Sequence, residues 1–203
     1  AGLLAFQNGK LEQARQYLEG ALKAGFNDPN ELRYVLGQLA EERKQPAQAQ
    51  SWYALVDAGD NLLPARVRLA QLQSAAGQWQ QAIASLAPLA ADPQNTVRIS
   101  LAQARMAKDA KQPEQAVALL DAALNILPGQ ADVLYERALL RESLGRVADA
   151  EQDLRTILKG RPDEPQALNA LGYILANQGR QLKEAQAYIE QALKAEPDNA
   201  MML

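Results

Sequence analysis

The sequence contains neither cysteine nor histidine, and aromatic residues make up only 5% of its 203 positions. A chain without these two residue types forms no disulfide, no thiolate nucleophile, no Cys/His zinc site and no imidazole general base. Its apolar runs also fall short of the roughly 18 residues that a membrane-spanning helix needs. Catalytic and metal sites that depend on cysteine or histidine are therefore excluded.

Motifs for phosphate binding and acyl transfer are missing as well. The chain has neither GxxxxGK[ST] nor GxGxxG, and it has no GxSxG elbow. Adjacent acids such as Glu41 and Glu42 stand among lysines and arginines and fit solvated helix faces. The net charge of -3 and the pI of about 5.1 argue against a nucleic-acid partner, which selects a basic surface. We predict that the chain is not an enzyme and binds no cofactor, metal ion or nucleic acid.

The residues that are abundant favour helices. Hydrophobic residues make up 48% of the sequence, and alanine and leucine supply most of them. Together with glutamine, glutamate, lysine and arginine, they have the highest helix propensities. The composition predicts an all-α protein.

An internal repeat runs through the whole chain. Nearly identical hexapeptides, KQPAQA and KQPEQA, occupy residues 44–49 and 111–116. Their closing alanines belong to a series that recurs every 33 to 35 residues: Ala14, Ala49, Ala82, Ala116, Ala150 and Ala185. Four residues after each alanine comes a large apolar residue: Leu18, Tyr53, Leu86, Leu120, Leu154 and Ile189. Before each alanine comes a small residue, twelve positions away except in the last copy, which has one extra residue: Gly2, Gly37, Ala70, Ala104, Ala138 and Gly172. This pattern predicts a helix–turn–helix unit of about 34 residues, whose small residues let two helices approach closely.

A turn is expected between the two helices of each unit. Four of the six turns have glycine at a position that suits the left-handed conformation: Gly9, Gly77, Gly145 and Gly179. Lys44 and Lys111 occupy the same position in the other two, where a left-handed lysine is strained. We therefore expect those two turns to have a different shape.

Prolines mark further positions in the second helices. Pro46 and Pro113 fall in the first helical turn, where the missing N–H costs nothing. Pro88 lies inside a predicted helix and cannot donate to the carbonyl of Ala84. We expect a bend or an early stop near residues 85–88.

These features resemble the tetratricopeptide repeat (TPR) family, whose pattern is W-x2-L-G-x2-Y, then A-x3-F, then P. The best local matches are YVLGQLAEERKQPAQAQSWYALV at 34–56 and LNALGYILANQGRQLKEAQAYIEQALKAEP at 168–197. The middle of the chain departs from the pattern: Arg66 and Ser100 replace the first aromatic residue, and Gln103 and Arg137 replace the leucine. The resemblance implies an all-α, right-handed superhelical solenoid of antiparallel hairpins, with the first helices lining a concave face.

The repeat pattern also divides the chain. We expect a single array in residues 1–203, with five complete repeats at 30–62, 63–96, 97–130, 131–164 and 165–199. Residues 1–29 read as a partial repeat and residues 200–203 as the start of another. The chain is therefore expected to be a piece of a longer solenoid, able to self-associate through its truncated ends in a crystal or in solution.

The resemblance places a partner protein or peptide in the concave groove. The residues assigned there are Tyr34, Gln38, Glu41, Arg98, Arg105, Lys108, Tyr135, Leu139, Asn169 and Tyr173. Tyrosine is enriched at interfaces, and Arg98, Arg105 and Lys108 form a basic group that suits an acidic partner segment. The Lys-then-Asn pair of chaperone-binding TPR proteins is absent, which argues against a chaperone tail as the partner.

A narrower resemblance concerns residues 131–200, in particular ALNALGYILA and the longer repeat that follows it. This stretch is similar to bacterial TPR lipoproteins of the outer membrane, which act as adaptors for a periplasmic carboxyl-terminal processing protease and its substrates. The resemblance implies a non-catalytic periplasmic scaffold, anchored to the outer membrane in the full-length protein, while a cytoplasmic location stays open. This fragment itself is expected to make no membrane contact.

Two alternatives remain. One is the TPR region of an O-linked N-acetylglucosamine transferase-like enzyme, which predicts a groove lined by asparagines, of which only Asn169 and Asn177 face the expected side. The other is an assembly protein for pili or secretion machinery.

Overall fold

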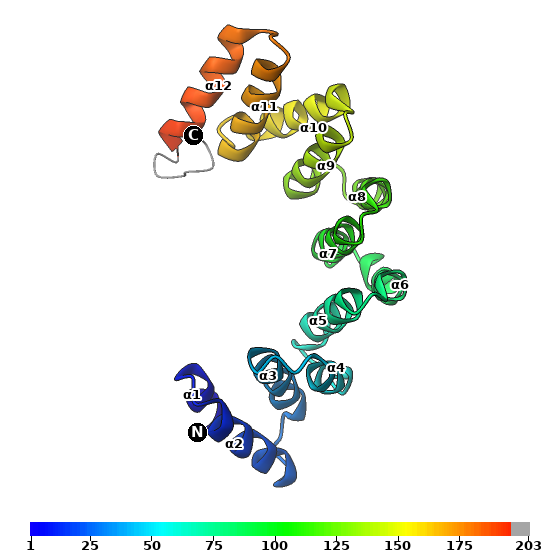
Figure 1. Cartoon of the computed structure of the whole chain (residues 1–203), viewed down its shortest axis with the longest axis vertical. Helices are drawn as coiled ribbons and strands as arrows, with labels where there is room; N and C mark the ends of the chain where they lie inside the picture. Colours follow the sequence, from blue (N-terminus) through cyan, green and yellow to red (C-terminus); the bar gives the residue numbers. More distant parts are fainter. Residues whose placement is uncertain (196–203) are drawn as a thin grey trace. The chain divides into compact units, whose positions relative to one another are not determined.

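A computed structural model of the protein describes residues 1–195 as twelve α-helices, with no β-strand in that range. The all-α prediction is confirmed (Figure 1). In chain order the helices are α1 (Gly2–Gln7), α2 (Leu11–Lys23), α3 (Pro29–Glu42), α4 (Pro46–Ala54), α5 (Leu62–Ala75), α6 (Trp79–Ala90), α7 (Thr96–Asp109), α8 (Pro113–Ile126), α9 (Ala131–Ser143), α10 (Val147–Gly160), α11 (Pro165–Asn177) and α12 (Leu182–Ala195).

The chain divides within α6 into two compact units. Unit 1 is Ala1–Leu86, and unit 2 is Ala87–Leu203. In unit 1, α1 packs against α2 and α3 against α4, while α2 also contacts α3 and α4 contacts α5. In unit 2, the pairs are α7 with α8, α9 with α10 and α11 with α12, and α8 and α10 also contact the first helix of the next pair. Each unit is thus a row of helical hairpins (Figure 1).

The alanine series lies at the centre of these hairpins. Each of the six alanines is the fourth residue of a second helix and is at most 2% exposed. The glycines among the small residues of the first helices leave no room for a side chain. A Cβ atom on Gly2 would lie 2.9 Å from Cδ2 of Leu18, and one on Gly172 would lie 2.7 Å from Cγ1 of Ile189. The predicted close approach of the two helices is therefore confirmed at these positions.

The turn between the two helices has one backbone design in all six hairpins. A residue with positive φ donates its N–H three residues back, and the next residue donates five residues back. In the second hairpin, Lys44 N–H donates to the Glu41 carbonyl at 2.8 Å and Gln45 N–H to the Ala40 carbonyl at 2.9 Å. This bond pair is the Schellman motif, which satisfies the carbonyls at a helix end.

The expectation that Lys44 and Lys111 form different turns is wrong. Their φ angles are 57° and 62°, in the left-handed region that the glycines of the other turns also occupy. The backbone bonds that close the turn are formed whether or not the residue carries a side chain. Pro46 and Pro113 begin α4 and α8, as predicted. The extra residue of the last copy is accommodated by Gln181, which has a φ of 48° directly before α12.

Of the bend or early stop expected near residues 85–88, the early stop is wrong, and the bend stays a prediction. Helix α6 continues through Pro88 to Ala90. Only two residues follow the proline, so its missing N–H affects the last turn and does not end the helix sooner.

The repeat limits at 30–62, 63–96, 97–130, 131–164 and 165–199 remain a prediction. The first helices of these repeats begin at Pro29, Leu62, Thr96, Ala131 and Pro165. The predicted start of a further repeat at 200–203 lies outside the described residues.

Candidate interaction surface

In unit 1 the predicted binding residues Tyr34, Gln38 and Glu41 all lie on α3 and are partly buried. The Tyr34 ring packs against the Tyr53 ring of α4, with centroids 5.7 Å apart and planes tilted by 49°. Tyr34 therefore also supports the core around Tyr53.

The carboxylate of Glu41 joins three helices. The Tyr53 hydroxyl donates to Oε1 of Glu41 at 2.5 Å, and the Arg68 guanidinium of α5 donates to both carboxylate oxygens, with Nε 3.0 Å from Oε1. Burial, together with the hydrogen bond to Glu41, raises the pKa of the Tyr53 hydroxyl. Glu41 thus has a structural role beside the binding role that the sequence predicts.

In unit 2 the basic residues Arg98, Arg105 and Lys108 lie on one side of α7, and all three are exposed. Among residues 1–195, none of them has a carboxylate within ion-pairing distance or a side-chain hydrogen bond. Their charges are therefore available to a partner.

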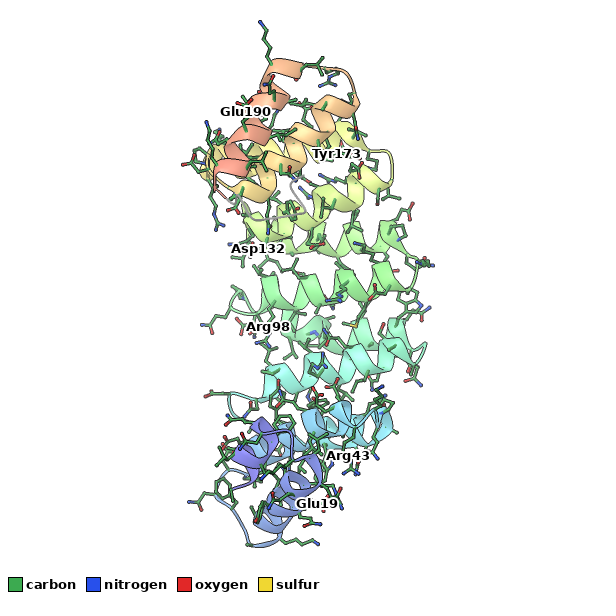
Figure 2. All side chains as sticks on the ribbon, turned by 60° about the vertical axis from the view of Figure 1, so that its left-hand side comes forward. Glu19, Arg43, Arg98, Asp132, Tyr173 and Glu190 are labelled. Atoms are coloured by element: carbon green, nitrogen blue, oxygen red, sulfur yellow. The ribbon has the colours of Figure 1, made fainter. Side chains whose placement is uncertain are left out.

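The remaining predicted residues of unit 2 lie on α9 and α11. Helix α9 packs against α7 and carries Tyr135, which is partly buried, and Leu139, which is 37% exposed. Burial raises the pKa of Tyr135, and Glu136 adds to the effect. On α11, Asn169 is partly buried and Tyr173 is 57% exposed. Figure 2 shows Arg98, Asp132 and Tyr173 on these three first helices. The fold therefore packs α7, which carries the basic residues, against α9, which carries Tyr135 and Leu139.

Unit 2 contains a cluster of ion pairs that was not among the predicted site residues. Asp153 of α10 has a side chain only 4% exposed and accepts from Arg137 at 2.6 Å and from Arg141 at 2.7 Å, both on α9. Asp121 of α8 accepts from Arg137 at 2.6 Å and from Arg141 at 3.4 Å. Burial alone would lower the pKa of Arg137, but its bonds to the two aspartates outweigh burial and raise the pKa. The sequence signal was Arg137 at the leucine position of the repeat, with Asp153 directly before the buried Leu154.

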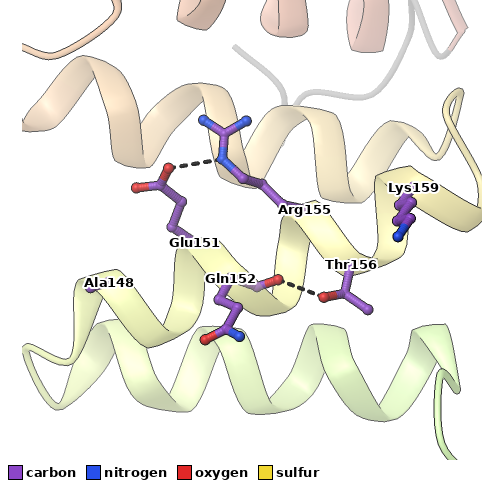
Figure 3. Close-up of a pocket in the computed structure, with 6 residues that line it drawn as sticks. All are labelled: Ala148, Glu151, Gln152, Arg155, Thr156 and Lys159. Carbon is purple, nitrogen blue, oxygen red and sulfur yellow. Dashed lines mark hydrogen bonds and ion pairs between the residues drawn. The ribbon is translucent and has the colours of Figure 1, made fainter.

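A shallow hollow lies along α10 (Figure 3). Its lining comes from one helix alone: Ala148, Glu151, Gln152, Arg155, Thr156 and Lys159. Arg155 bonds Oε1 of Glu151 at 2.8 Å and reaches Oε1 of Glu184 on α12 at 3.1 Å. The bonds from Arg155 and from the Tyr188 hydroxyl lower the pKa of Glu184. These contacts fasten α10 to α12.

Within residues 1–195, no group of three or more acidic, cysteine or histidine side chains is placed to hold a metal ion. None of the helices in that range is long and apolar enough to cross a membrane.

Comparison with known proteins identifies tetratricopeptide repeats in this chain. Residues 1–62 and 135–200 match the family model described as tetratricopeptide repeat. A TPR repeat-containing protein of Pseudomonas aeruginosa is 34% identical over 171 residues, which cover 84% of this chain and 29% of that protein. The chain therefore spans less than a third of this relative.

Solved structures share the fold. PilW, described as a widely conserved type IV pilus biogenesis factor, has a TM-score of 0.66 at 16% identity, covering 99% of this chain and 93% of its own. The MamA protein has a TM-score of 0.60 at 20% identity, covering 85% and 94%. PilF of Pseudomonas aeruginosa has a TM-score of 0.61 at 19% identity, covering 98% and 90%.

Proposed function

This chain belongs to the tetratricopeptide repeat family, and from that premise we propose that it is a non-catalytic scaffold that binds a protein or peptide through its first helices. The observation that carries the proposal is on α11. This helix contains no charged residue between Pro165 and Asn177, yet it exposes 57% of Tyr173. Exposed tyrosine on an uncharged surface is the composition of an interface centre, because charged residues are depleted there.

The finer proposal is that the chain is part of a periplasmic lipoprotein adaptor for a carboxyl-terminal processing protease. It is supported by the resemblance of residues 131–200 to outer-membrane TPR lipoproteins. In such an adaptor, the protein presents substrates and the protease supplies the chemistry. This agrees with a candidate surface that consists mainly of tyrosine, leucine, amide and basic side chains, with Glu41 as its one carboxylate.

Assembly of pili or secretion machinery is the second candidate. It is favoured by the coverage of nearly the whole chain in the comparison with PilW, which is described as a type IV pilus biogenesis factor. At 16% identity that likeness concerns the fold. The two candidates predict different partners for one surface.

Affinity capture with matched variants tests the scaffold function. The variant Arg105→Ala/Leu139→Ala/Tyr173→Ala removes exposed side chains from α7, α9 and α11. The control Tyr17→Ala/Ile126→Ala/Lys159→Ala removes exposed side chains of similar kinds from the second helices α2, α8 and α10. Each is used to capture proteins from a Pseudomonas aeruginosa envelope extract, followed by mass spectrometry.

We expect the control to retain the partners of the parent chain and the first variant to lose them. Equal capture by both variants would refute binding through the first helices. If a carboxyl-terminal processing protease is among the lost partners and binds the purified chain directly, the adaptor role is supported. If only pilus or secretion components are lost, the second candidate replaces it.

A further inference from the structure

We propose that unit 2 selects a partner segment rich in glutamate or aspartate, whose side-chain carboxylates lie against Arg98 and Arg105 of α7. This inference rests on the proposed scaffold function and adds the chemistry of the partner. It is carried by the pairing pattern of the arginines in the described part of the chain.

Most arginines in this protein are paired with a carboxylate of the same chain. Within residues 1–195, the exceptions are Arg66 on α5 and the two arginines of α7. Arginine binds a carboxylate through two parallel hydrogen bonds, which gives the contact both strength and a fixed geometry. Two exposed arginines without such a bond on one helix are therefore open sites for carboxylates.

The spacing of the two arginines defines the partner further. Arg98 and Arg105 are seven residues apart, so they lie on the same side of α7 about 10 Å from each other along the helix. Lys108 follows one turn later and extends the row. A peptide in the polyproline II conformation rises about 3.1 Å per residue with three residues per turn, so acidic residues three positions apart lie on one side, about 9 Å from each other, and match the two arginines.

The nearby acidic groups do not cancel this row. Asp109 and Asp132 are exposed and Glu142 is partly buried, and none of the three pairs with a basic residue of α7 in the described chain. Helix α7 itself carries three basic residues and one acidic residue.

Exposed apolar groups lie on the other first helices of unit 2. Leu139 is 37% exposed on α9, which packs against α7, and Tyr173 is 57% exposed on the uncharged α11. A partner that combines carboxylates with a large apolar side chain satisfies both kinds of group. The overall negative charge of the chain disfavours binding of nucleic acid. A nucleic acid also lacks the large apolar side chain that would contact Leu139 or Tyr173.

The test uses labelled peptides and fluorescence anisotropy. The probe is a twelve-residue peptide, amidated at its C-terminus, with glutamates three positions apart and one tryptophan. Matched peptides replace the glutamates by lysine or the tryptophan by serine, and a single-stranded DNA of similar length is the nucleic-acid probe. The protein variants are Arg98→Glu/Arg105→Glu and the control Lys159→Glu/Lys183→Glu, which changes the net charge equally on α10 and α12.

We expect the parent chain and the control to bind the glutamate peptide at low salt, and about 0.5 M salt to weaken binding strongly. The Arg98→Glu/Arg105→Glu variant should bind on the order of tenfold more weakly. Replacing tryptophan should also weaken binding, and the lysine peptide should not bind. Equal binding by the two charge variants, or equal binding of the glutamate and lysine peptides, would overturn the proposal. Tighter binding of the DNA through the same arginines would assign the row to nucleic acid instead.

Failure of this inference is distinguishable from failure of the scaffold function. If no glutamate peptide binds at millimolar concentration while affinity capture still depends on Leu139 and Tyr173, the acidic partner is refuted and the scaffold remains. If capture is also unaffected by substitutions on the first helices, both proposals are refuted.

Discussion

The Tyr53 ring of α4 packs directly against Gly37 of α3, on the side where any other residue would carry a Cβ atom. A Cβ atom on Gly37 would lie 2.7 Å from Cδ1 and Cζ of the Tyr53 ring and nearer still to Cε1. The ring itself is fully buried and donates its hydroxyl proton to Glu41. One residue without a side chain thus makes room for the largest residue of the unit 1 core.

Replacing Gly37 by alanine should therefore destabilise unit 1. Overpacking costs about 1–3 kcal/mol, while alanine regains roughly 1 kcal/mol of helix propensity, so we expect a net loss of up to about 2 kcal/mol. The control is Gly20→Ala on α2, where a Cβ meets nothing within 4 Å. That change should stabilise by roughly 0.5–1 kcal/mol. Urea denaturation followed by circular dichroism measures the free energy of unfolding of both variants. If Gly37→Ala is as stable as Gly20→Ala, the core around Tyr53 rearranges to accommodate the added methyl group.

Glycine at the strained turn positions should stabilise the chain. Lys44 and Lys111 hold left-handed conformations, which cost an L-residue roughly 1–2 kcal/mol. Since glycine loses more backbone entropy on folding, we expect Lys44→Gly and Lys111→Gly each to gain about 0.5–1 kcal/mol. The reciprocal change, Gly77→Lys, should lower the free energy of unfolding by a similar amount. Thermal unfolding of the three variants and the parent measures these differences. A loss of stability in either lysine variant would mean that the lysine side chain contributes contacts that outweigh the strain.

Asp153 should be the most sensitive charged residue of unit 2. Its removal leaves the largely buried charges of Arg137 and Arg141 with Asp121 as their remaining acidic partner. Breaking a buried ion pair from one side costs about 3–5 kcal/mol. Asp149→Ala on the same helix breaks the exposed pair with Arg146 and should cost no more than about 1 kcal/mol. Denaturant titration of the two variants tests this difference, and similar losses would show that the cluster is well solvated.

Acid should loosen the contact between α10 and α12. The pKa of Glu184 lies below its ordinary value of 4.5, mainly because Arg155 donates to its carboxylate. The folded state thus favours the ionised form, and this stabilisation is complete above pH 4.5 and is lost as the pH falls through the lower folded pKa. We expect the melting temperature of Glu184→Gln to change less than that of the parent between about pH 6 and pH 3. The exposed control Glu114→Gln should follow the parent, and parallel curves for all three proteins would refute a role for Glu184.

Much of the fold was predictable because the packing is periodic. The alanine at the fourth position of each second helix recurs, as does the small residue that faces it, and each is required by the distance between two helices. Two local features were not predicted correctly, at Lys44 and at Pro88. In both cases residue preferences were outweighed: backbone hydrogen bonds fix the turn at Lys44, and Pro88 stands too near the end of α6 to terminate it earlier.

The site was less predictable than the fold, since binding depends on which side chains are already engaged within the chain. Glu41 and Arg105 are both polar residues at predicted groove positions in the sequence. In the structure Glu41 bonds to Tyr53 and Arg68, whereas Arg105 has no carboxylate partner in the described residues. The Asp153 cluster was missed for the same reason, because its members come from the three successive helices α8, α9 and α10 and meet only in the fold.

The shared turn geometry bears on how such repeats are recognised in other sequences. A search profile that demands glycine after each first helix would pass over the hairpins at Lys44 and Lys111, and would count four where the backbone forms six. The bond pair that closes each turn tolerates lysine, so the reliable marker is the buried alanine, which follows the positive-φ residue by five positions in the turns without insertion. Profiles weighted toward that alanine would detect divergent copies in long arrays that glycine-based patterns split or shorten.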